Sequence, residues 1–138
     1  MSRKAWFYVL VIILVGVGLS IGTYFVTPMP EQAQFSIFVV LTVLATFSQL
    51  VEALEIHNQT FHPTMVFFIA GVLLLHPFLY VLLVLIPHLV EWIKERWLKS
   101  PRLAVWYIQP FNIAMHIIAG LGARWILRTL AVDPTRSF

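Results

Sequence analysis

The chain contains no cysteine, which excludes disulfide bonds, thiolate-held iron–sulfur clusters and thiol catalysis. Charged residues are also scarce, at 11% of the 138 residues, against about 25% in an ordinary soluble domain. No Ser–His–Asp set, HExxH, P-loop or GxGxxG motif can be recognised, so we expect no catalytic activity. The basic residues are clustered beside apolar runs and no soluble basic domain exists to carry them, which argues against nucleic-acid binding.

Long apolar runs take the place of the missing charges. From Thr60 to Val90 the chain has 31 residues without a single Asp, Glu, Lys or Arg. About 20 apolar residues are enough for a helix to cross the hydrocarbon core of a bilayer. Two similar runs and a further apolar region occupy the rest of the chain. The sequence therefore predicts an all-α, polytopic membrane helix bundle that has the lipid bilayer as its immediate partner.

Prolines divide the chain into about five predicted membrane segments. Pro28 and Pro30 end the first, and His76-Pro77 interrupts the long run, which favours two helices there over one kinked helix. The first of those two rises only about 18 Å, which is less than the roughly 30 Å hydrocarbon core, so it is expected to be short or re-entrant. The predicted helices of this single domain, residues 1–138, are 5–26, 33–54, 64–75, 77–98 and 110–130.

The distribution of Lys and Arg predicts a topology, because cytoplasmic loops carry an excess of these residues. If the middle run crosses twice, six basic residues are cytoplasmic and three are outside; a single crossing gives five and four. The first arrangement places Arg3, Lys4, Lys94, Arg96, Lys99 and Arg102 inside and Arg124, Arg128 and Arg136 outside. We therefore expect a multi-pass protein of the cell inner membrane with its carboxyl end outside.

Small and polar residues indicate which helix faces meet other helices. Gly18 and Gly22 form one GxxxG pattern, which permits a close contact of the first helix. In the second helix a stripe with helical spacing is expected to point at other helices. Its members are Thr42, Ala45, Thr46, Gln49 and Ala53.

The deepest polar residues are the candidate ligand-binding residues, because polar groups inside a membrane are functional suspects. Gln49, Asn112 and His116 are expected to line one small pocket. His116 lies beside small residues that leave room for a flat cofactor, so haem or chlorophyll ligation is a minority possibility. The favoured alternative is a hydrogen bond from His116 to another helix, for example to Gln49 or Thr46.

Two further groups of histidines have less specific surroundings. A polar cluster near one membrane face is a candidate for metal binding or proton relay. The favoured interpretation is a solvated polar connector. Its members are Glu52, Glu55, His57 and His62. His76 and His88 adjoin Pro77 and Pro87, and we interpret them as helix-break and interface residues.

From about Phe38 to Leu127 the chain resembles the amino-terminal membrane domain of bacterial cyclic-di-GMP signalling proteins with HD-GYP or GGDEF output domains. Four stretches carry the resemblance: QLVEALE, LLLHP, EWIKERWLKSPR and PFNIAMHIIAGLGARW. The pattern is also similar to the helical arrangement of vitamin-transporter S-components. His76 stands where the family often has Gly, and the family usually has a sixth helix and an output domain. A sensor without them would signal through a partner; the alternative is that the chain is not a sensor.

The leading functional expectation is a non-catalytic membrane module for ligand sensing or substrate binding, as the resemblance implies. An accessory transmembrane subunit of a respiratory or photosynthetic complex is the alternative, because the chain is small, helical and rich in aromatic residues. An S-component-like transport subunit is the third. Other membrane protein subunits or a signalling partner are the expected partners.

Overall fold

The computed structural model describes residues 1–52, 63–99, 101 and 104–130. Within these ranges the chain forms five helices and no strand, which confirms the all-α prediction. The helices are α1 (Arg3–Val26), α2 (Gln32–Glu52), α3 (Thr64–Leu74), α4 (Pro77–Trp97) and α5 (Ile108–Thr129). Three of them, α1, α2 and α4, are long and apolar enough to cross a membrane, and α3 is a shorter apolar helix. Every predicted boundary within the described residues lies within two residues of the observed one, whereas the predicted end of the second helix, residue 54, lies outside them.

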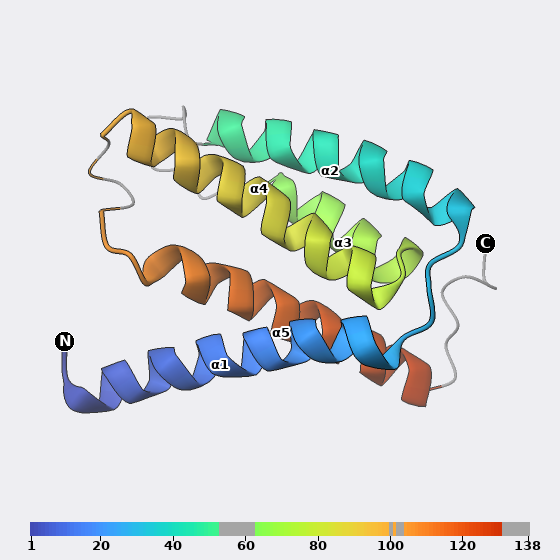
Figure 1. The fold of residues 1–138 in the computed structure, drawn as a ribbon, viewed down its shortest axis with the longest axis horizontal. Coiled ribbons are helices and arrows are strands. Elements are labelled where there is room, and N and C mark those ends of the chain that lie inside the picture. The colour runs from blue at the N-terminus through green and yellow to red at the C-terminus, as the bar shows by residue number, and fades with distance from the viewer. Residues whose placement is uncertain (53–62, 100, 102–103, 131–138) are drawn as a thin grey trace.

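Successive helices run in opposite directions, and α4 is the central one (Figure 1). It packs against each of the other helices, whereas α1 packs mainly against α5. Leu75, Leu79, Leu83 and Val84 are almost completely buried and form the centre of the apolar core. The predicted inward stripe of α2 is confirmed for the described positions, since Thr42 and Ala45 are buried and Thr46 and Gln49 half-buried.

The α1–α5 contact is made at a glycine, although not at the glycines of the GxxxG pattern. A Cβ added at Gly16 would lie 2.5 Å from the Cβ and 2.8 Å from the Cα of Ala114. At Gly18 and Gly22 a Cβ would meet no described atom within 4 Å. The close contact that the Gly18 and Gly22 pattern permits is therefore not made within the described chain, because the crossing point lies half a turn earlier on another face of α1.

The long uncharged run divides into two antiparallel helices, so the alternative of one kinked helix is wrong (Figure 1). At the break, the backbone N–H of His76 donates to Oε1 of Gln34 on α2, at 2.7 Å. Nδ1 of His76 accepts a weak hydrogen bond from the Phe78 N–H at 3.3 Å, which requires that this nitrogen carry no proton. Burial, followed by the positive charges of Arg124 and Arg128, lowers the pKa of His76 and favours that neutral form.

Helix α3 covers only part of the bundle, as its length predicts. Its first residue, Thr64, donates a hydrogen bond to Ser48 of α2 at 3.3 Å, and the turn after it is tied to Gln34. The stretch of α2 between these two contacts rises about 21 Å, less than the roughly 30 Å hydrocarbon core. The short segment therefore runs from inside the bundle to one of its ends.

Pro87 does not interrupt α4, which continues from Pro77 to Trp97. The interpretation of His88 as a helix-break residue is therefore wrong. Its side chain is only 3% exposed and lies among the other helices of the bundle.

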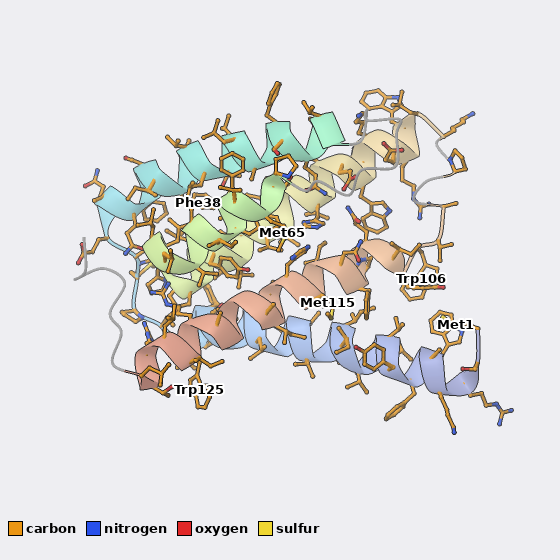
Figure 2. All side chains as sticks on the ribbon, turned by 180° about the vertical axis from the view of Figure 1, so that it is seen from behind. Met1, Phe38, Met65, Trp106, Met115 and Trp125 are labelled. Atoms are coloured by element: carbon orange, nitrogen blue, oxygen red, sulfur yellow. The ribbon has the colours of Figure 1, made fainter. Side chains whose placement is uncertain are left out.

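Aromatic residues lie at both ends of the bundle. The start of α1, the end of α4 and the start of α5 lie together at one end, where Figure 2 also places Met1 and Trp106. The rings of Trp6 and Tyr107 meet there edge to face at 5.0 Å. Trp and Tyr are enriched at membrane–water interfaces. The opposite end holds the end of α5, with Trp125 close to it (Figure 2).

Candidate ligand site within the bundle

A buried carboxylate lies where α2, α4 and α5 meet. Glu91 of α4 is only 5% exposed, and its Oε2 accepts two hydrogen bonds. Nε2 of Gln49 on α2 donates at 2.7 Å, and Nε2 of Gln109 on α5 donates at 3.1 Å. Burying a carboxylate is costly unless hydrogen bonds compensate it. These two amides therefore supply polar contacts that an apolar bundle cannot provide, and they join three helices at one oxygen.

Gln109 also fixes the backbone of α4. It is 1% exposed, and its Nε2 donates a second hydrogen bond to the backbone carbonyl of His88 at 2.9 Å. The bond is an additional tie between α5 and α4, since the donor that Pro87 lacks would have served the carbonyl of Leu83, four residues earlier. Nδ1 of His88 lies 2.8 Å from the carbonyl oxygen of Val84, one turn earlier.

Three rings from three helices meet beside this centre. The Phe68 ring of α3 stacks on the His88 ring of α4, with centroids 5.7 Å apart and an interplanar angle of 22°. The His116 ring of α5 lies 5.3 Å from His88 and meets Phe68 edge-on at 5.2 Å. His116 is thus in ring contact with His88, and the carbonyl of His88 is bonded to the amide that holds Glu91.

A groove of about 260 Å³ between α3 and α5 has His116 in its wall. On α5 the remaining wall consists of the small residues Ala119, Gly120 and Ala123 and of Leu127, and α3 supplies apolar side chains that include Met65 (Figure 2). The expected room beside His116 is therefore present, and it opens between exposed side chains toward the lipid.

Tyr80 closes the inner side of this groove. Its hydroxyl donates to the backbone carbonyl of His116 at 2.8 Å. The ring fits only because residue 120 is a glycine, since a Cβ there would lie 2.0 Å from the hydroxyl oxygen. Gly120 therefore permits the hydrogen bond that holds the backbone at His116.

The structure separates the three predicted ligand residues. Gln49 is bonded to Glu91, and His116 lies in the groove wall. Asn112 lies on α5 one turn before His116. Its side chain is exposed and does not line the groove. Ligand binding by any of the three stays a prediction.

The predicted metal cluster lies almost wholly outside the described residues. Glu55, His57 and His62 are not described, and Glu52 is described only as the last residue of α2. Among the described residues there is no group of three His, Cys, Asp or Glu that could hold a metal ion. The groove at His116 is smaller than the roughly 300–1,000 Å³ of typical ligand pockets, so a haem or chlorophyll ring would lie partly in the lipid.

Sequence reasoning missed His88, Glu91 and Gln109 as parts of one centre. A signal was present, because His88, Glu91 and Glu95 follow the i, i+3, i+7 spacing of one helix face, and all three are buried. The basic and aromatic residues of EWIKERWLK concealed it, since they favoured an interfacial anchor for the whole segment.

Comparison of the chain with protein-family models, with curated proteins and with solved structures gives no match.

Proposed function

We propose that this chain is a non-catalytic membrane module that senses a small, mainly apolar ligand taken from the bilayer. The observation that carries the proposal is the groove between α3 and α5, with the imidazole of His116 in an otherwise almost wholly apolar wall. Ligand pockets are mostly apolar and contain a few polar groups that fix orientation. The suitable ligand is flat or chain-like and carries one hydrogen-bonding group for His116.

The contacts behind His116 connect a ligand in the groove to the interior of the bundle. A ligand that turns the His116 ring changes its contacts with His88 and Phe68. The side-chain amide of Gln109 donates hydrogen bonds both to the carbonyl of His88 and to the carboxylate of Glu91. Glu91 in turn ties α4 to α2 through Gln49. A change at the groove is thereby converted into a change in how α2, α4 and α5 pack, which is what a sensor must transmit.

The hydrogen bonds that connect the groove to Glu91 support sensing over transport, because they link a groove-bound ligand to the packing of three helices. The signal would be delivered at the end of the bundle where α4 ends and α1 begins, because that end carries Arg3, Lys4, Arg96 and Lys99 exposed to a partner. In this proposal that end faces the cytoplasm of a bacterial cell, and the chain spans the inner membrane.

An accessory subunit of a larger membrane complex is the second candidate. The faces of α1 and α2 favour it, since only 17% and 11% of their membrane-spanning windows are buried within the chain. Such faces suit neighbouring subunits as well as lipid.

The test is extraction of the intact chain from its native membrane with a disc-forming copolymer, followed by mass spectrometry of what remains bound. Ala123→Trp fills the groove, and Ile126→Trp places the same side chain at an exposed position of α5 outside it. A small molecule retained by the parent and by Ile126→Trp, and lost with Ala123→Trp, supports the proposal. His116→Phe keeps a ring against Phe68 and removes the hydrogen-bonding nitrogens, so it is expected to weaken retention.

Equal retention by all variants would overturn the sensing site. Isolation of the parent in a large assembly that holds no groove-bound molecule would favour the accessory subunit instead.

A further inference from the structure

A second groove lies between α1, α4 and α5, on a different face of α5 from the groove at His116. Its volume is about 360 Å³. The α5 residues in its wall are Pro110, Ile113, Ala114 and Ile117, none of which lines the first groove. An occupant of the second groove can therefore be tested separately from the sensing proposal.

The wall of this second groove is almost entirely hydrocarbon. Its apolar residues include Ile13 and Val17 of α1, Val81 and Leu85 of α4, and Ile113 of α5. Its hydroxyl group, on Ser20, already donates to the carbonyl of Gly16 at 2.7 Å. The body of the groove thus offers dispersion contacts to an apolar chain and little to a polar molecule.

The groove exists because α1 is held against α5 rather than against α4. The close approach of Gly16 to Ala114 fixes the crossing point of α1 and α5. Val17 and Ile21 lie just after that point, are about half exposed, and border the groove on its outer side. An occupant can therefore enter sideways from the lipid.

A tryptophan lies at one end of the groove, with an arginine beside its ring. Trp92 lines it there, and the indole N–H of Trp92 is buried with no hydrogen-bond partner among the described residues. The side chain as a whole is partly exposed. The guanidinium of Arg96 lies 5.5 Å from the centre of the Trp92 ring, and it follows Trp92 by one turn, about 6 Å closer to the end of α4.

We propose that this groove binds one acyl chain of an anionic phospholipid. The chain lies along Val17, Leu85 and Ile113, an ester carbonyl accepts the Trp92 N–H, and the phosphate meets Arg96. The order of groups along α4 matches the order in a phospholipid, in which the hydrocarbon is followed by the ester and then by the phosphate. Arg3, Lys4 and Lys99, exposed at the same end of the bundle, favour an anionic head group over a zwitterionic one.

The test is native mass spectrometry of the delipidated chain, titrated with phosphatidylglycerol or with phosphatidylcholine. One phosphatidylglycerol is expected to bind more tightly than phosphatidylcholine. Val17→Trp fills the groove and is expected to abolish that difference, whereas Leu14→Trp, at an exposed position of α1 outside the groove, is expected to keep it.

Arg96→Gln tests the phosphate contact without changing the interior, because Arg96 is exposed. It is expected to weaken phosphatidylglycerol binding about fivefold, the effect of one basic residue at an anionic membrane surface. Lys99→Gln is the matched control and is expected to have the smaller effect. Equal binding of the two lipids by the parent, or an unchanged difference in a folded Val17→Trp variant, overturns the proposal. A dimer of the chain that Val17→Trp dissociates also overturns it, because the occupant is then a second copy.

Discussion

The guanidinium of Arg124, on α5, donates a hydrogen bond of 3.1 Å to the backbone carbonyl of Val72, in the last turn of α3. The same Nη1 also donates to the carbonyl of Leu75, the residue that caps that helix. The last carbonyls of any helix have no partner within it, and lipid supplies none. A short helix can therefore end here because α5 provides the donors, with a positive charge at the negative end of the helix dipole.

Arg124→Ala is expected to destabilise the chain by about 1–2 kcal/mol. Hydrogen bonds from charged groups contribute about 1.5–3 kcal/mol in soluble proteins, whereas interhelical ones in membranes average nearer 0.6 kcal/mol. Reversible unfolding in mixed detergent micelles, followed by circular dichroism, measures the change. Arg128→Ala, at an exposed position one turn later, is the control. Equal losses in the two variants would show that charge, and not the bonds to α3, is responsible.

Gly16→Ala and Gly18→Ala are expected to have opposite effects. At position 16 the new methyl group would meet the backbone of Ala114, so α1 and α5 must separate. Overpacking of this kind costs about 1–3 kcal/mol. At position 18 the methyl group meets no described atom, and replacing a helical glycine gains up to about 1 kcal/mol. The same unfolding assay compares them, and a larger loss at position 18 would contradict the α1–α5 crossing described above.

Gln109→Leu is expected to cost more stability than Gln49→Leu. Gln109 is fully buried and donates hydrogen bonds both to the carboxylate of Glu91 and to the backbone carbonyl of His88. Gln49 is half-buried, and the hydrogen bond observed for its side chain is the one to Glu91. Leaving a buried polar group without its partner costs about 1–3 kcal/mol. Glu91→Gln keeps an acceptor oxygen for both amides, so its expected cost is smaller than that of Gln109→Leu. The reverse order of Gln109→Leu and Gln49→Leu would show that the contact with α2 dominates.

Single-cysteine labelling checks the topology without interference, since the chain has no cysteine of its own. Ser2→Cys and Lys99→Cys lie at one end of the bundle, and Met29→Cys and Thr129→Cys at the other. A membrane-impermeant maleimide added to intact spheroplasts is expected to label only the second pair. Labelling of Ser2→Cys and Lys99→Cys instead would reverse the proposed orientation. Labelling of one member from each pair would contradict the arrangement of crossings.

The helices were predictable because local rules determine their ends. Prolines at 28, 30 and 77 end or begin a helix through their own backbone geometry, whichever helices lie nearby. The length of an apolar run is likewise read along the chain without reference to neighbouring helices. Even Pro110, preferred as the first residue of the last helix, lies in its first turn. Pro87 is the exception, because α4 remains helical through it with neighbouring helices packed around it.

The contacts between helices were not predictable in the same way. Whether Gly16 or Gly18 meets α5 depends on the rotation of α1 about its axis, and α1 is apolar on every side, so its sequence does not encode that rotation. The helical spacing places Gln49 on the inward face of the second helix, but it does not identify Glu91 as the partner of Gln49. The partner of a buried polar group is determined by the approach of a second helix, which hydrophobic periodicity alone does not specify.

The pairing of α1 with α5 has a consequence for synthesis at the ribosome. The contact of Gly16 with Ala114 joins two helices that lie 98 positions apart in the sequence. At roughly 5–20 residues per second, about 5–20 s pass between the translation of these two positions. During that interval α1 must stay in the bilayer without its main partner. Its mean hydropathy of 2.5, the highest of the three candidate spanning helices, suits a segment that stays in lipid without its partner until α5 is inserted.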